Sequence, residues 1–151
     1  MCHPFLYLRV LFFSTFLFLG YSSKAQSDIP VFKVSEMSPA EAFDHLQTFL
    51  IENEYFVQAM DSKQGFVQIK VLPKDRSMFK RAKRHTVNFF VMPDGKDNSK
   101  INLQINTERL DWNGEVNSSS HYYKDEGVLD KNNKVYDELI SELKKYYDQL
   151  L

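Results

Sequence analysis

The chain has 151 residues, with 19 Lys and Arg against 20 Asp and Glu for a formal net charge of −1, and a single cysteine. Charges so evenly balanced exclude a strong general attraction to nucleic acid, and one cysteine excludes an intramolecular disulfide framework. The length suits one domain built around one hydrophobic core.

The N-terminal segment has the pattern of an export signal. Arg9 is followed by a nearly unbroken apolar run that ends at Gly20, and the small residues Ser23 and Ala25 come next. A cation, an apolar stretch of ~10 residues and a small-residue exit are typical of a secretory signal peptide. Because a membrane span needs ~20 apolar residues, we expect cleavage near Ala25, with an uncleaved N-terminal anchor as the alternative.

Cleavage would divide the chain into a signal peptide, residues 1–26, and a single α+β domain, residues 27–151. The signal contains Arg9 and Lys24 and no acid, so the domain keeps 17 basic and 20 acidic residues, a net charge of −3. Cys2 precedes the apolar run, whereas a lipoprotein needs a cysteine after it. We therefore expect a protein of the periplasm or the extracellular space that is not a lipoprotein and has no transmembrane span after cleavage.

The first regular elements follow the export signal. Residues 31–34 favour a short edge strand, which Pro30 limits. Ser38 then suits a helix N-cap, Pro39 fits the first helical position, and Glu41 completes a capping box. Apolar residues at three- and four-residue spacing predict the buried stripe of a helix ending near Asn53. These residues are Ala42, Phe43, Leu46, Phe49 and Leu50.

Two hairpins are predicted after this helix. Residues 55–60 and 67–71 flank the turn DSKQG, and residues 87–91 and 101–105 flank the turn PDGKDNSK. Apolar and β-branched residues alternate with polar ones in these runs, which is the pattern of half-buried strands. Both turns are rich in turn-forming residues.

A second helix is predicted near the C-terminus, with Asn132 or Asn133 as its cap. One face of this helix would carry Val135, Leu139, Leu143, Tyr146 and Leu150. The order helix, two hairpins, helix predicts an α+β fold, α-β-β-β-β-α, in which a four-stranded antiparallel sheet has two helices packed on one face.

The other face of the predicted sheet should present mainly amide side chains. Antiparallel sheets commonly leave one face to water. The alternative is a platform for a partner, in which amides supply hydrogen bonds and phenylalanines supply contact area. The residues of this face are Gln68, Lys70, Asn88, Asn102, Gln104 and Asn106, with Phe66 and Phe90 among them.

The chain resembles small uncharacterised secreted bacterial domains with a TATA-binding-protein-like fold. The resemblance rests on the order of these elements and on the stretches AEAFDHLQTFL, DSKQG and FVQIKV within them. The outline is also similar to the domains of the outer-membrane assembly lipoprotein BamC. The resemblance implies a non-enzymatic envelope protein and supplies no catalytic residues.

A run of basic residues joins the two predicted hairpins. The segment KVLPKDRSMFKRAKRH has six net positive charges between Lys70 and Arg84. Such a cluster can attract phosphates or anionic lipid headgroups; the alternatives are a solvated connection and contact with an acidic patch of a protein partner. The candidate surface for an anionic partner consists of Lys74, Arg76, Lys80, Arg81, Lys83 and Arg84.

Residues 110–130 are predicted to form a long loop. It contains the only tryptophan, Trp112, and the pair Tyr122 and Tyr123. Long loops in compact domains are often functional, and Trp and Tyr are the residues that most often anchor partners. The alternatives are that these aromatics cap the core, or that the turn at Asn113 and Gly114 only extends the last strand.

No residues form a catalytic or metal-binding pattern. His45, His85 and His121 are far apart and lack partners at the spacing of a zinc site. We therefore expect no metal, no cofactor and no enzymatic activity. The predicted function is an exported envelope binding or scaffold module, whose partner is an envelope protein or an anionic surface. The alternative is a carrier of a small apolar ligand in a cavity between helices and sheet.

Overall fold

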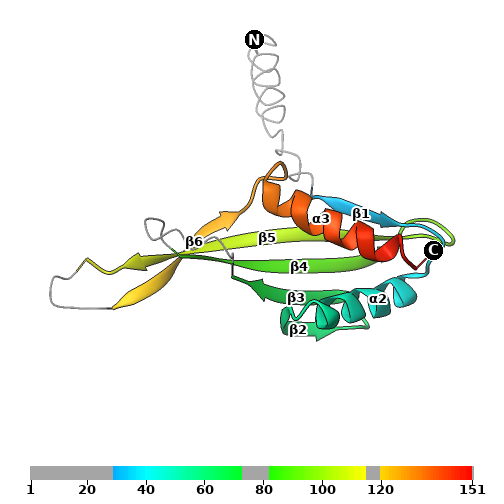
Figure 1. The fold of residues 1–151 in the computed structure, drawn as a ribbon, viewed down its shortest axis with the longest axis horizontal. Helices are drawn as coiled ribbons and strands as arrows, with labels where there is room; N and C mark the ends of the chain where they lie inside the picture. The colour runs from blue at the N-terminus through cyan, green and yellow to red at the C-terminus, as the bar shows by residue number, and fades with distance from the viewer. Residues whose placement is uncertain (1–28, 73–81, 115–119, 151) are drawn as a thin grey trace, which may run out of the picture.

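The computed structural model describes residues 29–72, 82–114 and 120–150, and its fold is α+β, as predicted. Within these ranges two helices cover one side of an open antiparallel sheet of six strands (Figure 1). In chain order the elements are β1 (Val31–Val34), α2 (Pro39–Glu52), β2 (Phe56–Asp61), β3 (Phe66–Val71), β4 (Lys83–Pro93), β5 (Ser99–Trp112), β6 (His121–Val128) and α3 (Lys134–Tyr147).

The predicted four-stranded sheet was too small. Both predicted hairpins are present as β2–β3 and β4–β5, but β1 and β6 belong to the same sheet. The strand order is β1-β5-β4-β3-β2, and β6 also pairs with β5. Because β5 is 14 residues long, one of its edges has room for β1 along residues 99–102 and for β6 along residues 106–112.

The gap between β1 and β6 along β5 is filled by groups from other elements. The Ile105 N–H donates to the hydroxyl oxygen of Tyr136 at 2.8 Å, and the Ile105 carbonyl accepts from the Leu129 N–H at 2.8 Å. The Leu103 N–H donates to the Pro30 carbonyl at 2.9 Å. The backbone of β5 therefore stays hydrogen-bonded where no strand lies beside it, as buried backbone requires.

Ser38 caps α2 as the sequence predicts. The Ser38 hydroxyl oxygen accepts from the Glu41 backbone N–H at 3.3 Å, and Glu41 Oε2 accepts from the Ser38 backbone N–H at 3.0 Å. This capping box satisfies two N–H groups that a bare helix start leaves without partners. The buried residues of α2 are those of the predicted stripe.

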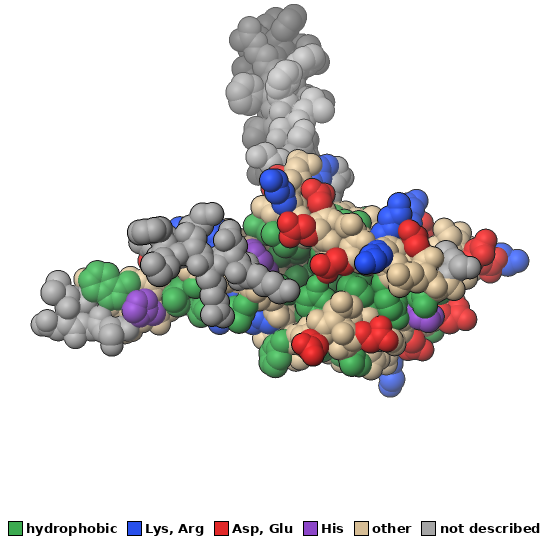
Figure 2. Space-filling model, viewed as in Figure 1, with side chains coloured by type: hydrophobic (Ala, Val, Ile, Leu, Met, Phe, Trp, Pro, Cys, Tyr) green, Lys and Arg blue, Asp and Glu red, His purple; other side chains and the backbone are tan. Residues whose placement is uncertain are grey.

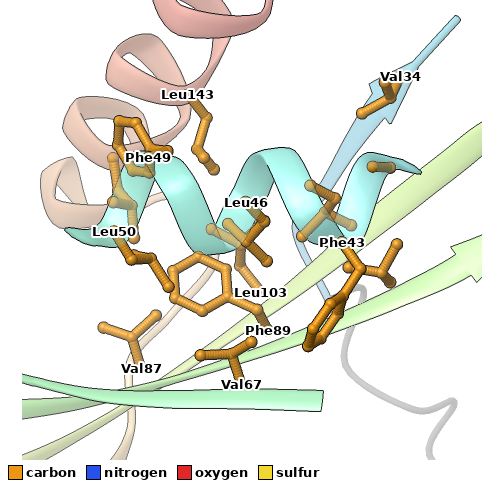
Figure 3. Close-up of a cluster of buried hydrophobic side chains, with 14 of the residues drawn as sticks. Val34, Phe43, Leu46, Phe49, Leu50, Val67, Val87, Phe89, Leu103 and Leu143 are labelled. Atoms are coloured by element: carbon orange, nitrogen blue, oxygen red, sulfur yellow. The ribbon is translucent and has the colours of Figure 1, made fainter. Parts of the chain in front are cut away.

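The hydrophobic core lies between the helices and the inner face of the sheet. Figure 3 shows Leu46 of α2 pointing toward Phe89 and Leu103 of the sheet. These three side chains are completely buried. Burying a large apolar side chain contributes about 1.5–3 kcal/mol, so this layer contributes much of the stability of the fold.

The buried face of α3 differs in part from the predicted one. Leu139 and Leu143 are buried as expected, but Tyr136 and Tyr147 complete the face, while Leu150 is exposed. Both tyrosines are buried with their hydroxyls bonded to backbone groups of other elements. A helical pattern of apolar residues does not reveal such partners, because they lie far away in the sequence.

Residues 110–130 were predicted to form one long loop, and this is wrong for two strand segments; the alternative, that the last strand is extended, is confirmed for residues 110–112. Residues 110–112 extend β5, and residues 121–128 form β6. The sequence of β6, HYYKDEGV, lacks the alternation that marks a half-buried strand. The paired residues 107–112 and 121–127 form an arm that extends beyond the helices (Figure 1).

Figure 2 looks onto the helix-covered side, where acidic side chains are scattered over the helices. In the same view, hydrophobic and histidine side chains lie at the far end of the arm. None of the helices in the described part of the chain is long and apolar enough to cross a membrane. The predicted signal peptide lies outside the described residues.

Candidate functional site

The outer face of the sheet, opposite the helices, carries side chains in rows that the strand register sets. Residues paired across antiparallel strands have side chains on the same face, and the next row lies two residues along. Three rows across β3, β4 and β5 consist of Phe66, Phe90 and Asn102; of Gln68, Asn88 and Gln104; and of Lys70, Thr86 and Asn106. The predicted amide face is therefore confirmed.

A shallow groove of about 500 Å³ lies along these rows. The Gln68 amide donates to Asn88 Oδ1 at 2.8 Å, and the Asn106 amide donates to Asp125 Oδ1 at 3.1 Å. A primary amide has two donors and two acceptor positions, so these bonds use only part of its capacity. The groove is lined by Gln58, Gln68, Lys70, Thr86, Asn88, Gln104, Asn106, Glu108 and Val128.

An ionic cluster of Lys70, Arg84 and Glu108 lies at one end of the groove. Glu108 accepts two bonds from Arg84, at 2.6 Å from Nε and 2.8 Å from Nη2, and Lys70 Nζ lies 3.4 Å from Glu108 Oε2. Bidentate pairs of this kind fix side-chain geometry. The bond from Arg84, with a smaller contribution from Lys70, holds the pKa of the Glu108 carboxyl below its usual range.

The arm is linked to this cluster by Tyr123. The guanidinium carbon of Arg84 lies 3.6 Å from the centre of the Tyr123 ring, which is a cation–π contact. Arg84 therefore uses its edge to bind Glu108 and its face to stack on Tyr123. The opposite end of the groove has the ring pair Phe66 and Phe90, whose centroids are 5.0 Å apart.

The structure separates the two described residues of the predicted basic surface. Lys83 and Arg84 lie on β4, and adjacent residues of a strand point to opposite faces. Lys83 Nζ donates to Glu126 Oε2 at 2.8 Å, while Arg84 binds Glu108. Lys74, Arg76, Lys80 and Arg81 lie outside the described residues.

The three predicted aromatic residues lie on the arm, where they do not form one patch. Trp112 pairs with His121, and Tyr123 pairs with Leu110, so Trp112 and Tyr123 share the outer side of the arm. Tyr122 points to the opposite side. Trp112 is 46% exposed and Tyr122 is 48% exposed.

A second depression, of about 670 Å³, opens beside the ends of α2 and β3. The Tyr55 hydroxyl donates to Glu142 Oε2 at 2.8 Å within it, and burial, together with Glu142, raises the pKa of Tyr55. His85 also borders it; burial lowers the pKa of His85, and its Nδ1 lies 2.8 Å from Thr107 Oγ1. The apolar lining comes from Tyr55, Phe56, Val71, Leu72, Val87, Val135 and Leu139.

Metal binding finds no support in the described ranges, where no group of three or more His, Cys, Asp or Glu side chains could hold an ion. The histidines considered from the sequence are on separate elements: His45 on α2, His85 on β4 and His121 on β6.

Sequence reasoning missed several residues of the groove. Thr86 belongs to the predicted alternation of β4 but was not included in the predicted outer face. Glu108 continues the alternation of β5 beyond the predicted strand end, so extending that pattern would have found it. Gln58 lines the groove through a bulge of β2 between Val57 and Ala59. Val128 belongs to β6, which was not predicted as a strand, and no sequence signal indicated its position.

No protein-family model and no curated protein matches the chain. Among solved structures, the chain is similar to a DUF4468 family protein from Bacteroides ovatus, with 16% sequence identity, coverage of 86% of each chain and a TM-score of 0.27. At this TM-score the likeness carries no argument about function. The resemblance to TATA-binding-protein-like and BamC domains remains a prediction.

Proposed function

We propose that the protein is a non-enzymatic, exported binding or scaffold module of the cell envelope, which holds its partner on the outer face of the sheet. The observation that carries this proposal is the groove of about 500 Å³, lined by amide, hydroxyl and charged side chains on the side opposite α2 and α3. Export is supported by the apolar run between Arg9 and Gly20.

The face of the sheet suits a partner better than its edges do. The pairing of β2 with β3 has a bulge between Val57 and Ala59, and the pairing of β5 with β6 shifts between Thr107 and Glu108. Bulges bend a strand and interrupt the row of backbone groups that an added strand would use. The described part of the sheet is therefore poorly suited to strand addition at these two positions.

The side chains of the outer face also suit the binding of a partner better than exposure to water alone. Phe90 is 40% exposed and contacts Phe66, so an apolar ring pair borders a set of amides. A partner would gain contact area from the rings and hydrogen bonds from the amides.

The test fills the groove without changing the core. A variant with Asn88→Arg and Gln104→Arg places two long cations in the groove, and a control with Ser141→Arg and Gln149→Arg adds the same charge at exposed positions on and just after α3. Both proteins are used as bait for crosslinking in the native envelope. We expect the groove variant to lose the partners that wild type and control retain; equal capture by all three proteins would refute the proposal.

A second candidate function, a carrier of a small apolar ligand, is favoured by the depression beside Tyr55. Its volume of about 670 Å³ is within the ~300–1,000 Å³ of small-molecule sites. The neutral dye N-phenyl-1-naphthylamine tests it: a carrier should bind the dye with increased fluorescence. Phe56→Asp, at a lining position that is 67% exposed, should remove this signal while the helical circular dichroism remains. No increase with the wild-type protein would exclude the carrier.

A further inference from the structure

From the chemistry of the groove, and resting on the function proposed above, we infer that its ligand is an uncharged saccharide. The lining side chains are amides or a hydroxyl at six positions: Gln58, Gln68, Thr86, Asn88, Gln104 and Asn106. Amides and hydroxyls both donate and accept hydrogen bonds. Sugar hydroxyls have the same double capacity, so a sugar can bond to such a surface in many places at once.

The charges around the groove argue against an ionic ligand. Glu108 binds both Arg84 and Lys70, and Asp125 accepts from the Asn106 amide. In the described part of the chain, two cations and two carboxylates therefore lie together, and the Arg84–Glu108 pair is held in bidentate geometry. An anion or cation would have to compete with a partner already in place, whereas an uncharged ligand would not.

The lining also argues against an apolar ligand, because Val128 is the only entirely aliphatic side chain among the described residues that line the groove. Burying amides under an apolar molecule would remove their water without giving them new partners, and each such loss costs free energy. A polyhydroxylated ligand replaces the lost water bonds.

The aromatic rings near the groove complete the match with a saccharide. Phe66 and Phe90 occupy the row next to Gln68 and Asn88, and Tyr123 lies beyond the other end against Arg84. Aromatic faces carry partial negative charge, and the C–H bonds on one side of a sugar ring are weakly positive. A short oligosaccharide lying along the rows could therefore bond to the amides and pack its end against the phenylalanine pair.

An extended peptide fits this surface less well. Peptides usually bind sheets by adding a strand to an open edge, where backbone groups pair with backbone groups. The groove lies on the face, where the backbone bonds of β3, β4 and β5 are already used within the sheet. Side chains alone would have to satisfy the peptide backbone.

The experiment titrates the protein with the β1,4-linked N-acetylglucosamine trimer or with maltotriose. The side-chain amide signals are observed in ¹⁵N NMR spectra. We expect saturable shifts of the signals of Gln68, Asn88 and Gln104. The Asn53 amide, which bonds to the Phe49 carbonyl at 2.8 Å near the end of α2, should not shift and serves as an internal control.

Two variants, each with leucine in place of an amide residue, test whether binding depends on the groove. Asn88→Leu removes hydrogen-bonding capacity from the groove and should weaken binding at least tenfold, whereas Gln149→Leu, exposed just after α3, should leave it unchanged. Backbone spectra of both variants should keep the wild-type pattern outside the substituted positions, which shows that the fold is retained.

The inference is overturned if neither sugar gives saturable shifts at millimolar concentration, or if Asn88→Leu binds as wild type does. It is also overturned if a blocked Ala-Ala-Gly peptide or inorganic phosphate shifts the same signals more strongly than the sugars. Loss of envelope partners by the arginine variant, combined with no response to sugars, would leave the proposed function standing and reject the saccharide alone.

Discussion

The hydroxyl of Tyr147 donates a hydrogen bond to the backbone carbonyl oxygen of Ala42 at 2.6 Å, and this bond joins the end of α3 to the start of α2. The Tyr147 ring also packs against Phe32 of β1, with centroids 5.4 Å apart. One buried side chain therefore connects both helices and the sheet.

Replacing Tyr147 by Phe should lower the free energy of unfolding by about 1 kcal/mol, because the ring stays and only the hydrogen bond is lost. Urea unfolding followed by circular dichroism measures the change. Tyr122→Phe is the matched control: the same hydroxyl is removed from an exposed position on the arm, and a change below about 0.5 kcal/mol is expected. Equal effects of both substitutions would contradict the role of the Tyr147 bond.

Because of the Tyr147 hydroxyl, we expect the free energy of unfolding to depend on pH in the alkaline range. Burial raises the pKa of Tyr147 above the ordinary value of 10.0. A tyrosine whose folded-state pKa is raised contributes its stabilisation fully below the unfolded pKa and loses it as the pH rises further, because the unfolded chain releases the proton more readily. The cost of Tyr147→Phe should therefore be smaller at pH 11 than at pH 8, and an unchanged cost would contradict this prediction.

The start of α2 allows a direct test of its cap. Ser38→Ala removes the acceptor for the Glu41 N–H and should cost about 1 kcal/mol in the free energy of unfolding. Ser38→Asp keeps an acceptor at the same position and should cost much less. If alanine and aspartate have the same effect on the urea midpoint, the cap contributes nothing to stability.

Gly65 ends the turn between β2 and β3 with a φ of +62°, a backbone conformation that favours glycine. An added Cβ would collide with the carbonyl oxygen of Val91, and the Val91 N–H donates to the Gly65 carbonyl at 2.8 Å. Gly65→Ala therefore combines a conformational cost of about 1–2 kcal/mol with a steric one of about 1–3 kcal/mol.

Gly95→Ala provides the matched control for this substitution. Gly95 also has a positive φ, of +100°, but an added Cβ would meet no atom within 4 Å. It should show the conformational cost alone in the same urea experiment. Equal destabilisation by the two substitutions would show that the contact with Val91 can relax.

The helices and central strands could be predicted from the sequence because their signals are local. The capping residues Ser38 and Glu41 lie three positions apart, and the alternation of β4 and β5 is set by neighbouring residues. The same alternation also predicted the amide face. For these elements, local propensity and burial favour the same structure.

The arm and the ionic cluster could not be predicted, because both depend on contacts distant in sequence. β6 is a strand because it pairs with the free edge of β5, although its own sequence lacks the alternation of apolar and polar residues that marks a half-buried strand. Arg84 looked like part of a basic connection, but Glu108, 24 residues away, and Tyr123 determine its surroundings. A charged residue in a run gives no sign of which partner the fold will bring to it.

The basic segment remains a candidate for binding anionic surfaces, and the structure changes how to test it. Lys83 and Arg84 are bonded to Glu126 and Glu108, so they are poorly placed to bind a membrane as well. Any attraction should come from the other four cations. Each charge near an anionic surface adds about 1 kcal/mol, screened over about 10 Å at 0.1 M salt.

The test replaces four residues by Ser: Lys74, Arg76, Lys80 and Arg81. This variant should no longer co-sediment with anionic vesicles at about 50 mM salt, and its unfolding midpoint should stay unchanged. For the wild-type domain, salt at about 500 mM should also abolish co-sedimentation, because it screens the attraction. The double variant Lys83→Ser and Arg84→Ser should show the reverse: retained vesicle binding and a slightly lower midpoint, because each of the two partly exposed ion pairs that are lost contributes no more than about 1 kcal/mol. No sedimentation of the wild-type domain at low salt would show that the segment does not bind anionic surfaces. Loss of binding only in the double variant would locate the attraction on β4 and contradict the assignment to the other four cations.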